Sequence, residues 1–417
     1  MKISFGYAVK CCIALLMMAG YASSGSDTNI DQLIREVNQD TLRATVQRLQ
    51  NFKSRYLTHD SCRSAEQWIH DYFNMIGLDS VYFDTAQFQT TNIRNIIGTI
   101  PGDGKPDSII VIGGHMDACL WNKQQGFLPD QSWAPGADDN GTGTAAVLEI
   151  ARVLKKYKAR FRWTLKFVAF SGEEQWEVGS KHWVNSVVSP KRMKLHSFFN
   201  IDMIGFHKPS VDSNLMYVVP NTASQHISRM ADSVNQWYDL NLYLNTTVKN
   251  NQSGDHTPFW EKNYDGVMIS EAAQEDIWDN DAYPCYHTVC DTIGNIMFGL
   301  VKRTTQMVLG AATTFAHPVS VTPVAEPRSV PGPLPEAHLT IQQVANGWTI
   351  SLPLDAAGSF LAIRSLNGRE ITRLSVQGKT VFWNGKDRSG TRVATGVYVL
   401  MQKTRKRTSS ARICVAR

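Results

Sequence analysis

Cysteine is scarce in this sequence, with 7 residues among 417. Two of them, Cys11 and Cys12, lie in the first apolar run, and the other five are spread over the rest of the chain. This low density excludes a small scaffold that depends on disulfides, and the paired CxxC motifs of a zinc ribbon are absent. Only Cys285 and Cys290 are close enough in sequence to suggest a short-loop disulfide.

The chain also lacks a strong charge imbalance, because its formal net charge is only +5. Residues 336–417 hold 13 Lys and Arg against 4 Asp and Glu, a net +9, so the preceding part is net −4. We therefore expect no nucleic-acid partner. The basic residues that end the chain suggest contact with an anionic cell surface or with export machinery, and the alternative is an ordinary solvated terminus.

Long apolar runs are missing after the N-terminus. The run Cys11 to Ala22 is too short to span a bilayer. Lys2 and Lys10 precede it and small residues follow it, which is typical of a signal peptide. We predict a signal peptide over residues 1–24 and an exported protein that is secreted, periplasmic or attached to the cell surface.

The remaining chain divides by composition. Residues 25–317 alternate helical and strand patterns, residues 318–335 are rich in proline and predict an extended linker, and residues 336–417 have short alternating strands between turns. The last part has no cluster of His, Cys or carboxylates, so we expect a non-catalytic β-sandwich there.

The large region predicts an α/β layered domain. Ser108 to Ile112 and Thr164 to Phe170 are almost continuously apolar, as in strands buried on both faces of a mostly parallel sheet. Asp31 to Asn51, Ser64 to Ile76 and Thr144 to Lys156 have helical spacing.

Five motifs place metal-capable side chains after a strand or before a helix, where α/β proteins bind ligands. They are GGHMD with His115 and Asp117, PGADDNGTG with Asp138 and Asp139, FSGEEQ with Glu173 and Glu174, NIDMIG with Asp202, and CYHTVCDT with His287 and Asp291. Each has a structural alternative: a hydrogen-bonded core histidine, a helix cap, solvated glutamates or an internal hydrogen bond. The Lys-Ser/Thr pair of a P-loop is absent, which argues against phosphate.

The five motifs together favour a metal centre. Asp138, Glu174 and Asp202 supply −3 and a hydroxide −1, which would neutralise two divalent cations and suit a partly buried site. Histidine and carboxylate ligands fit zinc, with manganese or cobalt as competitors.

In order and spacing, these motifs resemble the co-catalytic zinc aminopeptidases of the bacterial leucyl aminopeptidase and aminopeptidase Y type, over about Val37 to His317. The resemblance implies a mixed, mostly parallel sheet between helices and two zinc ions per chain. It implies that Asp138 bridges both ions, with His115 and Asp202 on one and Glu174 and His287 on the other. Glu173 would be the general base and Asp117 would orient His115.

The same resemblance implies that a metal-bridging hydroxide attacks peptides with a free N-terminus. Met116, Ala118, Trp176 and Glu177 depart from the usual pattern. Trp121, Trp133 and Trp176 therefore suggest a reshaped cleft, with ordinary packing as the alternative. Tyr286 and Asp255, or His256 beside it, are candidates for the substrate side. We expect Cys119, Cys285 and Cys290 to be structural, because zinc ligation is complete without them.

Residues 382–402 resemble the closing hairpin of Ig-like domains in flagellar hook-capping proteins and in C-terminal sorting domains of secreted bacterial proteins. This resemblance implies a secretion or attachment role for the tail. Two other functions stay open at this point: a glutaminyl cyclase-like enzyme with one zinc, and an inactive surface-binding protein.

Overall fold

The computed structural model describes residues 28–207, 214–272 and 283–322, and parts of 340–415. The chain forms two compact units, residues 1–324 and 325–417. The expected signal peptide and residues 323–335 of the expected linker lie outside the described residues.

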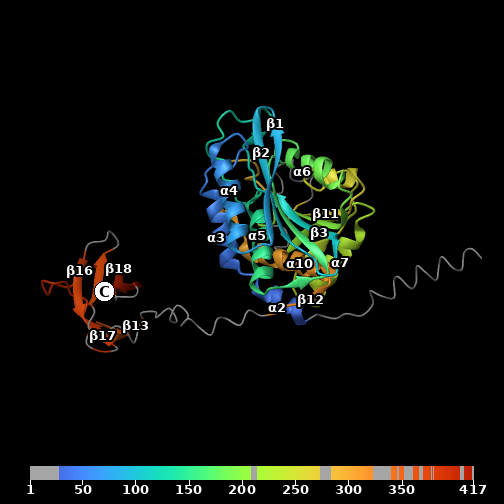
Figure 1. Cartoon of the computed structure of the whole chain (residues 1–417). Helices are drawn as coiled ribbons and strands as arrows, with labels where there is room; N and C mark the ends of the chain where they lie inside the picture. Colours follow the sequence, from blue (N-terminus) through green and yellow to red (C-terminus); the bar gives the residue numbers. More distant parts are fainter. Residues whose placement is uncertain are drawn as a thin grey trace, which may run out of the picture. The chain divides into compact units, whose positions relative to one another are not determined.

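An eight-stranded sheet forms the centre of the first unit, in the order β1-β2-β7-β3-β8-β11-β9-β10 (Figure 1). The strands are β1 (Ser80–Phe88), β2 (Thr91–Ile100), β3 (Lys105–His115), β7 (Trp163–Phe170), β8 (Lys194–Ile201), β9 (Leu215–Pro220), β10 (Tyr243–Asn245) and β11 (Gly266–Ser270). The four central strands β7, β3, β8 and β11 are parallel. Antiparallel pairing of β1 with β2, β2 with β7, and β9 with β11 makes the sheet mixed, which confirms the predicted fold.

The central strands are buried on both faces, as their apolar runs predict. Ile110 and Ile112 of β3 pack in the larger core cluster, whereas Ile109 and Val111 pack in a second cluster with Trp183. This alternation follows from the two-residue period of a strand. The sheet is therefore a layer between two sets of helices.

Most helices lie against the larger cluster. In Figure 1, α3, α4 and α5 cover one side of the sheet and α6 lies on the other. The helices are α2 (Thr28–Glu36), α3 (Gln39–Gln50), α4 (Asp60–Met75), α5 (Gly141–Lys156), α6 (Val178–Trp183), α7 (Gln225–Trp237), α8 (Thr257–Glu261) and α10 (Phe298–Ala316), with a π-helix at Val184–Val188 and a 3-10 helix at Ile293–Asn295.

The helical pattern over Asp31 to Asn51 is two helices, α2 and α3, not one. Asn38 separates them with extended backbone, and its side chain accepts hydrogen bonds from the amides of Asp40 and Thr41. An asparagine in this role begins a new helix.

The first five residues of the expected linker, 318–322, belong to the first unit. β12 (Pro318–Ser320) pairs with β6 (Arg160–Phe161), and the Thr322 amide donates to the Tyr157 carbonyl at 3.1 Å. The predicted boundary at residue 318 is therefore too early, because proline-rich sequence also pairs at a sheet edge.

The second unit contains two antiparallel sheets, ordered β13-β14-β17 and β16-β15-β18-β19. The strands are β13 (Thr340–Val344), β14 (Gly347–Ser351), β15 (Phe360–Ser365), β16 (Glu370–Ser375), β17 (Thr380–Trp383), β18 (Gly396–Lys403) and β19 (Thr408–Val415). Trp348 and Trp383 from one sheet share a buried cluster with Leu361 and Leu400 from the other. The two sheets thus enclose one small core.

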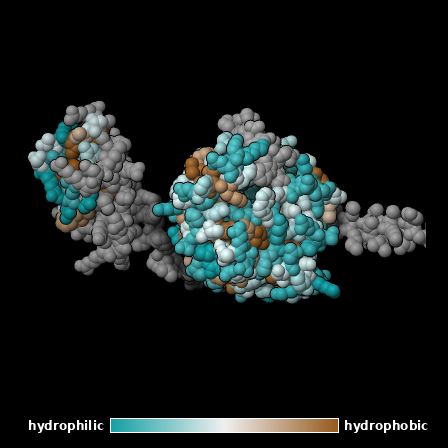
Figure 2. Space-filling view, turned by 90° about the horizontal axis from the view of Figure 1, so that it is seen from above, coloured by the Kyte–Doolittle hydropathy of each residue, from teal (hydrophilic) through white to brown (hydrophobic). Residues whose placement is uncertain are grey.

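The surface of the first unit is mostly hydrophilic on the face shown in Figure 2, with small separate hydrophobic areas. Among the described residues, none of the helices combines the length and the apolar character that a membrane crossing requires.

Candidate active site

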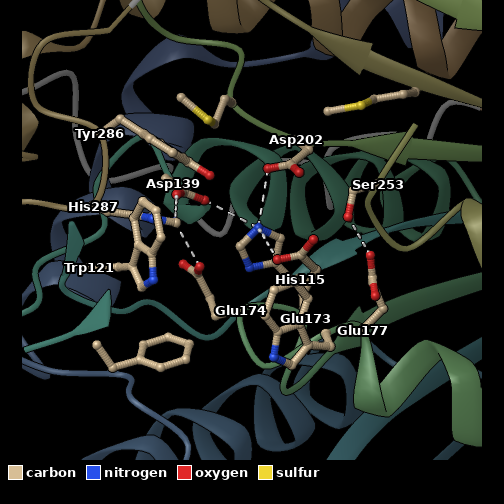
Figure 3. Close-up of a pocket in the computed structure, with 14 residues that line it drawn as sticks. His115, Trp121, Asp139, Glu173, Glu174, Glu177, Asp202, Ser253, Tyr286 and His287 are labelled. Carbon is tan, nitrogen blue, oxygen red and sulfur yellow. Dashed lines mark hydrogen bonds and ion pairs between the residues drawn. The ribbon is translucent and has the colours of Figure 1, made fainter. Parts of the chain in front are cut away.

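Three neighbouring strands bring the predicted residues together at their carboxyl ends. His115 is the last residue of β3, Asp202 follows β8 directly, and Glu173 follows β7 after a short turn. Because β7, β3 and β8 are adjacent and parallel, these ends meet at one edge of the sheet. Figure 3 shows the side chains around one pocket, with His287 and Trp121 at the left and His115 and Asp202 to their right.

The first half of the cluster surrounds His115. Its Nε2 atom lies 3.2 Å from Asp139 Oδ1, 3.2 Å from Asp202 Oδ1 and 3.9 Å from Glu173 Oε2. The imidazole is buried, with only 1% of its side chain exposed. Three carboxylates thus face a single ring nitrogen.

The second half surrounds His287. Its Nε2 atom lies 3.1 Å from Asp139 Oδ2 and 2.7 Å from Glu174 Oε2. The Cys285–Cys290 disulfide brackets this histidine in sequence, which agrees with the short-loop bridge that the spacing permits. The Trp121 ring meets the imidazole edge-on, and the Tyr286 ring stacks on it with centroids 3.7 Å apart.

Asp139, not Asp138, lies between the two histidines, which corrects our choice of Asp138. Asp138 points away from the pocket, where its Oδ1 accepts hydrogen bonds from Thr142 Oγ1 at 2.9 Å and from the Gly205 amide at 3.0 Å. The local backbone directs these two neighbouring carboxylates apart, so Asp139 lines the pocket and Asp138 does not. Burial and the nearby charge of Asp291 raise the pKa of Asp138 to about 8.

The helix-cap alternative for these aspartates is wrong as well. Asn140 is the N-cap of α5, and its Oδ1 accepts the Gly143 amide at 2.8 Å. The cap therefore leaves the Asp139 carboxylate free to face the histidines.

Two groups hold the turn that carries Asp139. The Asp291 carboxylate accepts the backbone amides of Asp138 at 2.8 Å and Asp139 at 3.0 Å, and the Tyr283 hydroxyl at 2.8 Å. Arg55 is buried and donates to the carbonyls of Pro135 and Gly136 just before this turn and to that of Met116. The sequence suggested a supporting role for Asp291, but Arg55 belongs to no motif and was missed.

Asp117 joins the first and third motifs. Its two carboxylate oxygens accept the amides of Glu173 at 3.2 Å and Glu174 at 3.3 Å, and Oδ1 lies 3.7 Å from His115 Nδ1. The closest contacts of Asp117 are therefore with the backbone of the glutamate pair, while its carboxylate also lies beside the ring that it was predicted to orient.

The electrostatics of the cluster are unusual for a protein interior. Burial lowers the pKa of His115 and His287, but the acidic groups around each ring, led by Asp202 at His115 and by Glu174 at His287, together outweigh it and hold both pKa values well above the ordinary range. Burial, with Asp202, also raises the pKa of Glu173 well above its usual value against the pull of His115. Such shifts are typical of functional sites.

The pocket has a largely apolar wall. Trp121, Phe127, Trp176, Met203, Met268 and Tyr286 line it together with the charged cluster. Tyr286, which we predicted to contact the substrate, is among the residues that line the pocket. Trp133 does not line the pocket.

Asp255 does not reach the pocket, so its predicted substrate contact is wrong. The residue is fully buried, and burial raises its pKa to about 8. Ser253 lines the pocket instead, and its hydroxyl donates to Glu177 Oε1 at 2.6 Å. Gly254, at φ +125, lies between the two residues and allows this turn.

The donor set fits divalent cations. Asp139, Glu173, Glu174 and Asp202 gather four carboxylates around two imidazoles, and buried Glu174 Oε1 has no hydrogen-bond partner. An excess of buried negative charge requires compensation. Ring nitrogens of imidazole and carboxylate oxygens are ligands that zinc accepts.

Comparisons with known proteins agree with this site. Residues 95–312, more than half of the chain, match the profile of peptidase family M28. A probable leucine aminopeptidase of Arthroderma otae is 28% identical over 307 residues, which cover 70% of this chain and 77% of that protein.

Solved structures match the fold at lower identity. The LapA aminopeptidase of Legionella pneumophila has a TM-score of 0.60 and 18% identity, over 72% of this chain and 76% of that one. A Zn-dependent exopeptidase of Parabacteroides distasonis has a TM-score of 0.54 and 21% identity, over 67% of this chain and 98% of that one. On these findings, the chain belongs to peptidase family M28 and is a metallopeptidase.

Proposed function

We propose that this metallopeptidase is an exported di-zinc aminopeptidase, which removes the N-terminal residue from peptides with a free N-terminus. One observation carries the proposal: the two oxygens of Asp139 face two different imidazoles, at 3.2 Å from His115 and 3.1 Å from His287. A carboxylate in this position is suited to bridge two ions. The names of the curated relative and of the Legionella structure support the N-terminal specificity.

Each half of the cluster would hold one ion. His115, Asp202 and Asp139 Oδ1 form one set of ligands, and His287, Glu174 and Asp139 Oδ2 form the other. The carboxylates of Asp139, Glu174 and Asp202 contribute −3 against the +4 of two zinc ions. The sequence-based charge count had the same total, with Asp138 where the structure has Asp139. Manganese or cobalt would compete for the same ligands.

The residues around the ions divide the chemical work. When bound, two zinc ions polarise the scissile carbonyl and lower the pKa of the attacking water. The Glu173 carboxylate lines the pocket beside this cluster, which suits it to take the proton of the water and to pass it to the leaving amine. The Asp117 carboxylate holds Glu173 in place because it accepts a hydrogen bond from the backbone amide of Glu173.

The apolar wall of the pocket favours peptide substrates whose N-terminal residue has an apolar side chain. Trp121, Met203 and Tyr286 lie along the pocket next to the charged cluster, and an apolar side chain would gain free energy by leaving water there. This preference is inferred from the residues that line the pocket of this chain, and it agrees with the name of the relative, a probable leucine aminopeptidase.

Export is supported by the sequence of residues 1–24 and by the Cys285–Cys290 disulfide, because disulfides persist mainly in oxidising compartments. The second unit, with its basic terminal residues, would contact the cell surface or the export machinery. An Ig-like character of its two sheets belongs to the same proposal.

Two alternatives are disfavoured by particular residues. A glutaminyl cyclase-like enzyme needs one zinc, whereas both halves of this cluster have a complete set of imidazole and carboxylate groups. An inactive binding protein needs neither ligands nor a base, yet Glu173 is present beside them. Metal stoichiometry separates these functions.

The test combines metal analysis with a panel of aminoacyl chromogenic amides. We expect about two zinc ions per chain, loss of activity with a strong chelator, and recovery with zinc. We expect Glu173→Gln to keep the metal content and to lose activity by roughly a hundredfold or more. A stoichiometry near one with cyclase activity would replace the proposal, and substantial turnover by Glu173→Gln would remove Glu173 from the mechanism.

A further inference from the structure

Cys119 lies within the metal cluster, although no motif assigned it a role there. It follows Asp117 in the loop after β3 and is 4% exposed. Its Sγ atom lies 3.1 Å from Glu174 Oε2. The thiol, a carboxylate oxygen of Glu174 and a ring nitrogen of His287 all lie within 4.8 Å of one another.

From this geometry we propose that Cys119 is a further ligand of the ion held by Glu174 and His287, bound as a thiolate. The inference rests on the proposed di-zinc function. It also revises our expectation that Cys119 is structural. On binding, the thiol would release its proton to water and form an S–Zn bond, without change of oxidation state.

The positions of these atoms fit a shared ion. Ligand atoms bound to one zinc at about 2.0–2.3 Å lie within roughly 4.6 Å of one another. Cys119, Glu174 and His287 approach this condition in the absence of an ion. Glu174 also has a buried second oxygen, Oε1, without a hydrogen-bond partner, which is an independent sign that this corner accommodates a cation.

The thiol is available for this role. The described cysteines Cys285 and Cys290 are bonded to each other, while Cys119 and Cys62 are free. The alternative role for Cys119 is to donate a hydrogen bond to Glu174, which a serine hydroxyl could also do. The two roles differ because only a thiolate forms a sulfur–metal bond.

A thiolate would make the two halves of the centre unequal. The half around His287 would have four protein ligands, Asp139, Glu174, His287 and Cys119. The half around His115 would have three protein ligands, Asp139, His115 and Asp202. We therefore expect the ion beside His115 to be removed first by a chelator.

The ligand set also predicts metal preference. A soft thiolate favours zinc and disfavours manganese, relative to a site with only imidazole and carboxylate. Replacing Cys119 by Ser should thus narrow the difference between zinc and manganese affinity at this half.

Cobalt substitution of the full chain tests the proposal directly. Cobalt bound to a thiolate gives a near-ultraviolet charge-transfer absorption that imidazole and carboxylate ligands do not give. We expect this absorption in the wild type and in Cys62→Ala, and its loss in Cys119→Ser. The Cys62 thiol is equally buried and free, so its variant is a matched control. Cys119→Ala provides a second variant that lacks the thiol.

Affinity gives a second measurement that does not depend on activity. Competition with a zinc chelator should show a loss of affinity of more than about a hundredfold at one of the two sites in Cys119→Ser, because loss of a hydrogen-bonding partner outside the ligand shell costs only about 10- to 100-fold. Cys62→Ala should match the wild type.

The possible results separate this inference from the proposed function. If the wild type binds two cobalt ions without the charge-transfer absorption, the thiolate ligand is overturned and the di-metal function stands. If the absorption persists in Cys119→Ser, the inference fails in the same way. If the wild type binds neither cobalt nor zinc, both proposals are overturned.

Discussion

At the scale of single residues, a shift of one position in the sequence decides which carboxylate lies between the two histidines. Asp138 and Asp139 have the same chemistry, and both are buried. Their difference arises from the backbone: the Asp138 carboxylate turns to Thr142 and Gly205, whereas that of Asp139 turns to the two histidines. The side chains of Asp138 and Asp139 are identical, so the sequence alone does not distinguish the two positions. A match to the motif can therefore be correct while the candidate ligand within it is assigned one residue away.

This difference predicts opposite results for two matched substitutions. Asp139→Asn should lower the metal content below two ions per chain, because a neutral amide cannot bridge two cations. Asp138→Asn should keep both ions, since its Oδ1 would still accept from Thr142 and Gly205. Elemental analysis of the purified variants checks both. Loss of metal in Asp138→Asn alone would return the bridging role to Asp138.

A second residue-scale prediction concerns acid stability. His256 is fully buried, and burial lowers its pKa to about 3. The unfolded chain binds a proton at this residue with an ordinary pKa of about 6.5, so its contribution to stability is complete above that value and is lost as the pH falls towards 3.

As the pH falls from about 7 to about 5, the free energy of unfolding should decrease by about 2 kcal/mol because of this residue. His256→Asn should remove this part of the pH dependence. Urea unfolding at both pH values measures it, and the quantity to compare is the difference between the two pH values in each protein, because the cavity left by Asn affects both equally. Equal pH dependence in wild type and variant would contradict the assignment.

At the scale of secondary-structure elements, the sequence predicted the parts that periodicity controls. β3 and β7 lie where continuous apolar runs placed them, and α5 lies over the predicted helix. The break between α2 and α3 was missed because its cause is the conformation of one residue, Asn38. Asp255 was misplaced for a similar reason, since the turn at Gly254 decides which neighbour reaches the pocket.

The turn between β7 and α6 carries a prediction about substrate binding. Trp176 and Glu177 are consecutive residues with left-handed backbone, at φ +68 and +54. The Trp176 side chain lines the pocket, yet the residue is 71% exposed. Because the Trp176 ring is so exposed, burial of the ring contributes little to the stability of the fold. Strained backbone of this kind is often found at functional sites.

We expect Trp176→Gly to raise KM for peptide substrates with a smaller effect on kcat, because the ring would contact the bound peptide. The same variant should be as stable as the wild type or more stable by up to about 1 kcal/mol, since glycine adopts the left-handed conformation freely. Tyr243→Ala is the control, because Tyr243 is also well exposed but does not line the pocket. An unchanged KM in Trp176→Gly would assign the ring no part in binding.

At the scale of the whole molecule, the chain combines one unit that contains the complete candidate site with a second that contributes no described residue to it. Every residue that lines the pocket belongs to the first unit. The second unit has its own core around Trp348 and Trp383. The separation of charge in the sequence follows the same division, with the acidic catalytic part before the basic tail.

This organisation predicts that the catalytic unit works alone. A chain that ends after Thr322 keeps β12 paired with β6 and keeps the bond from Thr322 to Tyr157. We expect this truncated protein to fold, to bind two zinc ions and to retain kcat/KM within about twofold, because removing a separate folded unit changes none of the groups around the pocket. A truncation after His317, at the boundary predicted from the sequence, removes that edge strand and should lower the Tm. If the chain ending at Thr322 folds and binds both ions but loses activity, the second unit takes part in catalysis, and the division of function proposed for the two units is wrong.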